Sequence, residues 1–123
     1  MKVTELLARY VTETSYKSFP KEVVHQAKRC FLDLLGVALG GAYQPLGKIL
    51  VKTVKEFGGK PQATIWGHGL KTNVMNAALV NGAIAHALDY DDTHVRSMGH
   101  PSAPLIPRSW LCPSGKVFPE NQP

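Results

Sequence analysis

Hydrophobic residues recur at helical spacing along most of this chain. Residues 3–15 carry them at intervals of three and four, as in Val3, Leu6, Leu7 and Tyr10. This spacing places the apolar side chains on one face, so it predicts a short amphipathic helix.

A second apolar stripe begins after Pro20, whose missing N–H is tolerated in the first turn of a helix. The stripe consists of Val23, Ala27, Cys30, Phe31, Leu34, Leu35 and Ala38. It predicts a helix that runs to about Leu39 and stops at Gly40-Gly41. A third helix fits residues 46–57, before the next pair of glycines.

Two further segments complete the pattern. Residues 63–66 form a short β-like run between turn residues. Thr72 or Asn73 suits the N-cap of a fourth helix, which we expect to reach about residues 88–92. The fold class predicted is mainly α, a partial helical bundle with one short β segment.

The fourth helix is rich in small residues, which let neighbouring backbones approach closely. They are Ala77, Ala78, Gly82, Ala83, Ala85 and Ala87. We therefore expect a central helix surrounded by others, in which Asn76 and Asn81 need hydrogen-bond partners.

The end of that helix carries a dense group of polar side chains. Residues 85–94 read AHALDYDDTH, and Gly99-His100-Pro101-Ser102 follows. Solubilising charge is usually mixed in sign, whereas here three aspartates stand together beside histidine and threonine. Such a mixture indicates proton-transfer chemistry.

The three aspartates are electrostatically costly where the pattern places them. They face the negative end of the helix dipole and repel one another. That cost indicates a metal, a cationic partner or a role in proton transfer. We expect Asp89 to be buried, whereas plain exposure to solvent is the competing interpretation for Asp91 and Asp92.

A metal site is the main rival among enzyme functions. The spacing Asp89-x-x-Asp92 is similar to the aspartate-rich Mg²⁺ motif of isoprenoid synthases, and hard cations favour oxygen ligands. Those enzymes need a second acidic motif, and here the only later acid is Glu120. We therefore expect no metal ligands and no cofactor.

Composition narrows the remaining classes. The 123 residues suit one small domain, and the net charge of +5 comes from the first half of the chain. Lys48, Lys52 and Lys55 recur at helical spacing, as on a solvated face, and no aromatic–basic alternation indicates nucleic acid. Cys30 and Cys112 are isolated, so we expect reduced thiols. No signal or membrane-spanning segment is recognisable, which makes the cytoplasm the expected location.

The polar cluster and several upstream segments resemble one family. Residues 76–94 and 99–104, together with PKEVV at 20–24, FLDLLGVA at 31–38 and ATIWG at 63–67, are similar to MmgE/PrpD sequences. The combination of Asp-x-Asp-Asp-Thr with a downstream His-Pro-Ser is specific, and the likeness extends to about Pro107.

The resemblance implies an activity and a set of site residues. Family members are dehydratases, decarboxylases and epimerases that act on small di- or tricarboxylates such as 2-methylcitrate. They abstract a proton next to a carboxylate, need no metal or organic cofactor, and are usually homodimers. By position, Asp89, Thr93 and His100 match active-site residues of the family.

The residue chemistry gives each candidate a role. His100 is the candidate acid or base, since imidazole titrates nearest to physiological pH, and Asp89 is a candidate base or a group that orients a histidine. Thr93, His94 and Ser102 are the substrate-binding candidates. Ser102 is also expected to cap a helix that presents its N–H groups to an anion.

Two further residues, His86 and Arg96, each have a structural and a functional interpretation. His86 lies inside the helical pattern and is interpreted as a structural histidine. Arg96 is a candidate carboxylate clamp, with simple solvation as the alternative.

The sequence after Pro107 departs from the family pattern. Residues 108–123 contain three prolines and no helical period, so we expect a divergent, disordered tail after an N-terminal family portion at 1–107. The resemblance covers only the first part of the family's length. The expected function is therefore that of a lyase-type enzyme whose isolated chain is inactive, and the alternative is a non-catalytic helical fragment that binds a partner or is unstable.

Overall fold

The computed structural model describes residues 2–96 and 98–111, the side chains of 110 and 111 excepted. Its elements are α1 (Val3–Glu13), the 3-10 helix η1 (Tyr16–Ser18), α2 (Lys21–Gly41), α3 (Pro45–Phe57), β1 (Ala63–Ile65), β2 (Leu70–Thr72), α4 (Val74–His86) and α5 (Ser102–Leu111). The prediction of a mainly α fold is confirmed, and the first three predicted helices form close to their expected bounds.

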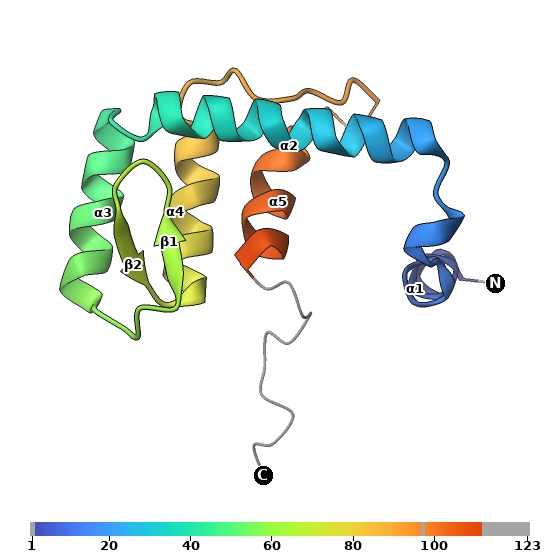
Figure 1. The fold of residues 1–123 in the computed structure, drawn as a ribbon, viewed down its shortest axis with the longest axis horizontal. Coiled ribbons are helices and arrows are strands. Elements are labelled where there is room, and N and C mark those ends of the chain that lie inside the picture. The colour runs from blue at the N-terminus through green and yellow to red at the C-terminus, as the bar shows by residue number, and fades with distance from the viewer. Residues whose placement is uncertain (1, 97, 112–123) are drawn as a thin grey trace, which may run out of the picture.

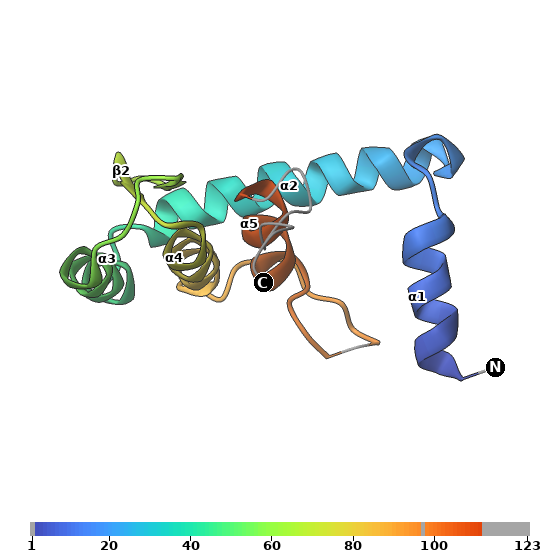
Figure 2. The same ribbon diagram turned by 90° about the horizontal axis from the view of Figure 1, so that it is seen from below.

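Helix α2 is the longest helix, and the other elements are arranged along it (Figure 1). Helices α3, α4 and α5 lie side by side across one side of α2, and α1 stands apart at its N-terminal end (Figures 1 and 2). The loop after α4 projects away from α2 and then returns to the start of α5, beside the end of α4 (Figure 2).

The core lies where α4 meets its neighbours. It is built from Leu34 and Ala38 of α2, Val51 and Val54 of α3, Ile65 of β1, Val80, Ile84 and Ala85 of α4, and Ala103 of α5. The small residues of α4 allow the close approach that the sequence predicted. A Cβ built on Gly41 would collide with the backbone carbonyl of Ile84, so a glycine is required where α2 crosses α4.

A hairpin is fastened to α4 by a buried amide. Strand β1 pairs with β2 in antiparallel register, Ala63 opposite Thr72. The Trp66 N–H donates to Asn81 Oδ1 at 2.9 Å, and Asn81 Nδ2 donates to the Thr64 carbonyl at 3.0 Å. The expectation that Asn81 needs partners is confirmed. The sequence does not predict β2, because Leu70–Thr72 contains a single strongly apolar residue.

Helix α4 begins where the sequence predicts but ends earlier than expected. Asn73 caps it, since its side chain accepts from the Asn76 N–H at 2.9 Å. The helix stops at His86 and does not reach 88–92. Asp89 adopts the left-handed backbone conformation, with φ of 51°, and this turns the chain out of the helical path.

Helix α5 corrects the prediction for the start of the tail. It continues through Pro107 to Leu111. Residues 108–111 are therefore helical, whereas the sequence predicts a disordered tail there. An internal proline costs about 3 kcal/mol in an exposed helix, but the Pro107 side chain is fully buried. Its burial with the half-buried Ile106 offsets that cost. The rest of the expected disordered tail, 112–123, lies outside the described residues.

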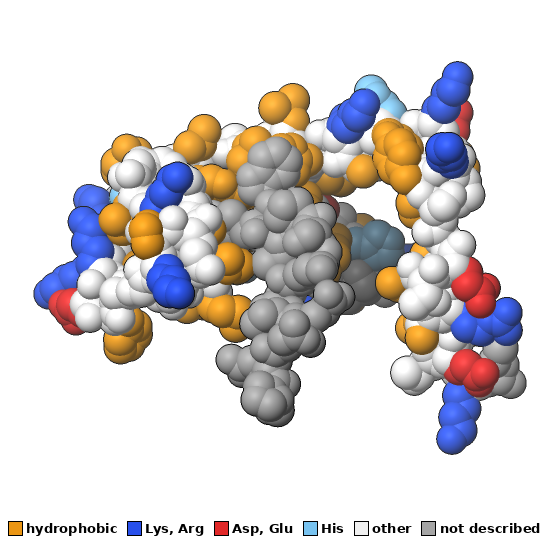
Figure 3. Space-filling view, turned by 60° about the horizontal axis from the view of Figure 1, so that its bottom comes forward, with side chains coloured by type: hydrophobic (Ala, Val, Ile, Leu, Met, Phe, Trp, Pro, Cys, Tyr) orange, Lys and Arg blue, Asp and Glu red, His pale blue; other side chains and the backbone are white. Residues whose placement is uncertain are grey.

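The N-terminal part of the molecule leaves apolar side chains uncovered by the described residues. Helix α1 forms, but Leu6, Leu7 and Tyr10 on its apolar face are between 53% and 59% exposed. Figure 3 shows apolar side chains on the side of α1 that is turned toward the other helices. The predicted amphipathic face therefore exists without a covering partner among those residues.

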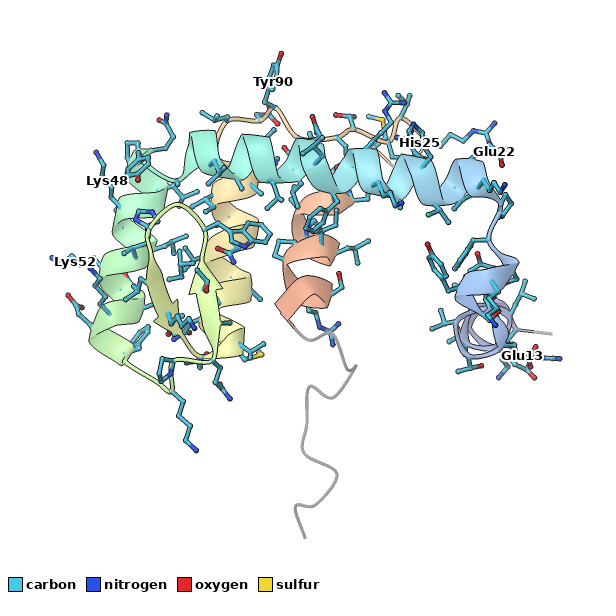
Figure 4. The ribbon with its side chains drawn as sticks, viewed as in Figure 1. Glu13, Glu22, His25, Lys48, Lys52 and Tyr90 are labelled. Carbon is cyan, nitrogen blue, oxygen red and sulfur yellow. The ribbon has the colours of Figure 1, made fainter. Side chains whose placement is uncertain are left out.

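The remaining sequence-based expectations are met in part. Lys48 and Lys52 extend away from the outer side of α3 (Figure 4), as a solvated face requires. Cys30 is a free, half-buried thiol. Among the described helices none is by itself long and apolar enough to cross a membrane, and α2 with α3 meets that test only as a pair bent by 85°.

Candidate active site

Four of the predicted polar residues converge where α4 ends. His86 is the last residue of α4, Asp89 and Asp91 follow in the loop, and His100 precedes α5. A backbone bridge between His94 and Gly99 folds the loop back on itself. One ligand-type atom from each of the four residues lies within 4.8 Å of the others.

Asp91 is the buried centre of this cluster. Its side chain is fully buried, and His86 Nδ1 donates to Asp91 Oδ1 at 2.9 Å. His100 Nδ1 lies 3.4 Å from the same oxygen. A carboxylate can only accept hydrogen bonds, and a buried one needs such partners. The contact therefore favours the His86 tautomer with its hydrogen on Nδ1.

The expected burial of the aspartates is reversed. Asp89, predicted to be buried, has a side chain that is 80% exposed, and Asp91, for which exposure was the competing interpretation, is covered. Asp89 lies three residues after the end of α4 in the left-handed backbone conformation, and its side chain is exposed. Asp91, two positions later, then lies beside the two histidines.

The two imidazoles form the accessible side of the cluster. Their ring centroids are 4.8 Å apart in an edge-to-face arrangement. His100 Nε2 lies 3.7 Å from Asp89 Oδ1, which is ion-pair distance but long for a hydrogen bond. The predicted pair of Asp89 and His100 is thus brought together, and sequence reasoning missed that His86 and Asp91 belong to the same cluster.

Asp92 has a different partner from the other aspartates. The backbone N–H and the hydroxyl of Ser102 donate to its two carboxylate oxygens, at 3.1 and 2.7 Å. The carboxylate therefore sits at the positive N-terminal end of α5, where a negative charge is stabilised. The first turn of α5, expected to face a substrate anion, is in this arrangement already paired with Asp92.

The substrate-binding candidates are placed less centrally. Ser102 is buried and its hydroxyl is engaged with Asp92. Thr93, His94 and Arg96 are exposed on the loop. Their proposed contacts with substrate remain predictions, because no contact within the described residues tests them.

A cavity adjoins the two histidines. It has a volume of about 480 Å³ and is lined by Ala78, Leu79, Gly82, Ala83, His86, His100, Ala103 and Pro104. The small side chains of α4 leave this space between α4 and α5. Its polar side chains are the two imidazoles, and the part of the chain that the structure describes contributes no Lys or Arg to the lining.

Comparison with known proteins identifies one family and several relatives of this chain. Residues 5–110 match the MmgE/PrpD N-terminal domain. The chain is 27% identical over 105 residues to a cis-aconitate decarboxylase-like protein, oryM, of Aspergillus oryzae, and 28% identical over 106 residues to the human and mouse cis-aconitate decarboxylases.

These matches cover most of this chain but only a small part of each relative. Each covers 85% of this chain but only 22% of the relative, so the chain spans about a fifth of the length of the curated relatives. Since the family match extends over nearly all of the described residues, the chain belongs to the MmgE/PrpD family and corresponds to its N-terminal domain.

Proposed function

We propose that this chain supplies the acid–base part of a lyase site that acts on a small di- or tricarboxylate. The observation that carries the proposal is the buried Asp91 carboxylate beside His86 and His100, whose rings line a cavity. His100 moves the proton, and the neighbouring Asp89 orients or activates it. Thr93 and His94 are the loop residues proposed to contact a substrate carboxylate.

Decarboxylation of a cis-aconitate-like substrate is favoured over dehydration and epimerisation. The support is that the relatives named above are cis-aconitate decarboxylases or are described as like them. When CO2 leaves an unsaturated tricarboxylate, the carbon that receives the electron pair needs a proton. A protonated imidazole at the cavity wall is suited to donate it.

The isolated chain is proposed to be inactive. A tricarboxylate requires several cationic or N–H donors, and the described lining of the cavity includes neither Lys nor Arg. The missing donors would come from regions of a longer family protein or from a partner chain. The alternative function, a non-catalytic fragment that docks on a partner, is favoured by the exposed apolar face of α1.

A graft experiment tests the proposal directly. Residues 5–110 replace the matching segment of the human relative, and release of CO2 from cis-aconitate is measured for the graft and for the isolated chain. We expect turnover from the graft, a loss of roughly a hundredfold or more with His100→Gln, and none from the isolated chain.

The control is His25→Asn, since His25 is exposed on the N-terminal half of α2 (Figure 4) and does not belong to the cluster at the end of α4. A well-folded graft whose turnover survives His100→Gln would contradict the acid–base role. Turnover by the isolated chain would contradict the proposal that further donors are required.

A further inference from the structure

Three potential ligand atoms converge at the end of α4 with the spacing of a metal site. His86 Nδ1 and His100 Nδ1 lie 2.9 and 3.4 Å from the same Asp91 oxygen. Zn²⁺ bonds of about 2.0–2.2 Å in tetrahedral geometry place neighbouring ligand atoms about 3.3–3.6 Å apart. The 3.4 Å distance lies in this range and the 2.9 Å distance is shorter, so a small movement of the His86 side chain suffices.

A second observation indicates that this cluster is incomplete as it stands. His100 Nδ1 is buried and has no hydrogen-bond partner, although it lies 3.4 Å from an Asp91 oxygen. A buried polar atom that is left unsatisfied is destabilising. A cation placed between the three atoms would bind this nitrogen and also compensate the buried carboxylate.

The surroundings leave the fourth position of such a site open. Asp89 belongs to the same cluster but is exposed and lies near His100 Nε2 at 3.7 Å, so it is a neighbour of the proposed site and not one of its ligands. Both imidazoles line the 480 Å³ cavity, which leaves one side open to water or a small ligand. Three protein ligands and an open position are typical of accessible zinc sites.

We propose that His86 Nδ1, Asp91 and His100 Nδ1 bind a divalent transition metal of the Zn²⁺ class, with the fourth position open. Two nitrogen ligands disfavour Mg²⁺ and Ca²⁺, which prefer oxygen. The proposal differs from the Mg²⁺ motif weighed above, since Asp92 is engaged at α5 and both histidines take part.

Metal binding would exclude the role of His100 as a base. An imidazole bound to metal through Nδ1 carries its hydrogen on Nε2, so Nε2 no longer accepts a proton. Bound Zn²⁺ would therefore inhibit the activity proposed above. The metal site itself does not depend on that activity, because binding is measured on the chain directly.

The test is calorimetric titration of the full 123-residue chain with ZnCl2. A Cys30→Ser/Cys112→Ser background removes thiol ligands. We expect one Zn²⁺ per chain, with affinity reduced roughly tenfold or more in His86→Gln and in His100→Gln. Asp89→Asn is expected to weaken binding less, because its carboxylate faces His100 Nε2 and not Nδ1. His25→Asn is the matched control and should bind as the parent does, since His25 is exposed on α2 (Figure 4) and lies outside the cluster.

Co²⁺ absorption gives an independent readout. In the background with both cysteines present, we expect the d–d bands of a nitrogen- and oxygen-ligated ion without a thiolate charge-transfer band. A thiolate band, absence of Zn²⁺ binding, or unchanged affinity in both histidine variants would overturn the proposal. Because Asp91→Asn risks unfolding the chain, the two histidine variants carry the decision.

Discussion

A carboxylate remains in a protein interior only where hydrogen bonds or opposite charges replace its hydration. Asp91 meets this condition through His86, which donates at 2.9 Å, and it also draws His100 to 3.4 Å. The buried Asp91 carboxylate thus positions the imidazole rings of both His86 and His100 at the cavity. Asp89, by contrast, is exposed and contributes no packing. The two aspartates should therefore differ sharply in their effect on stability.

Asp91→Asn is expected to lower the free energy of unfolding by about 1–3 kcal/mol, since an amide replaces the charge-assisted acceptor of a buried hydrogen bond. The matched substitution Asp89→Asn should change it by less than about 0.5 kcal/mol, because the group is exposed. Urea denaturation followed by circular dichroism measures both. Equal effects would show that Asp91 does not organise the site.

At the scale of elements, the contact between α4 and α5 depends on a glycine. Pro107 cannot donate to the Ala103 carbonyl, and this carbonyl faces Gly82 of α4. A Cβ built on Gly82 would lie 3.1 Å from that oxygen. The two helices are therefore as close as a glycine permits, and the cavity beside His86 and His100 lies at this contact.

Two glycine-to-alanine substitutions, one at this contact and one away from it, test this dependence. Gly36→Ala on α2 meets nothing within 4 Å, so it should stabilise the chain by about 0.5–1 kcal/mol through helix propensity. Gly82→Ala should lose that gain and destabilise by about 1 kcal/mol, because α5 must move away. The thermal midpoints of the two variants give the comparison. A stabilising Gly82→Ala would mean that the helices separate freely.

At the scale of the whole molecule, the described residues leave the apolar faces of α1 and of the first part of α2 uncovered. Leu6, Leu7 and Val23 are about half exposed or more. A cavity of about 460 Å³ lies at η1 and the first part of α2, lined by Tyr16, Phe19, Val23, Val24, Ala27, Lys28 and Phe31. Contiguous apolar surface of this kind marks an interaction site. The homodimer implied by the family resemblance remains a proposal.

Self-association of the isolated chain is the expected consequence. Light scattering during gel filtration should show a mass that rises with concentration, and Leu6→Gln/Leu7→Gln should shift the chain toward the monomer. Lys52→Gln on the solvated side of α3 (Figure 4) is the control. A parent chain that stays monomeric at every concentration would contradict an exposed docking face.

The sequence by itself determined the helices and the candidate residues. Apolar spacing located α1, α2 and α3, because helix periodicity is a local property of the chain. Small residues identified α4 as central, and the concentration of acids and histidines indicated where the chemistry lies. The positions of Asp89 and His100 could be predicted as neighbours only through the family resemblance.

Tertiary structure decided the rest. A single left-handed residue at position 89 and the return of the loop beside α4 determine that Asp91 is buried and Asp89 is not. Burial of Pro107 lets α5 continue through a proline, and the N-terminus of α5 gives Asp92 a positive partner. Each outcome depends on groups far apart in sequence, whose desolvation and charge interactions are set only when the helices pack together.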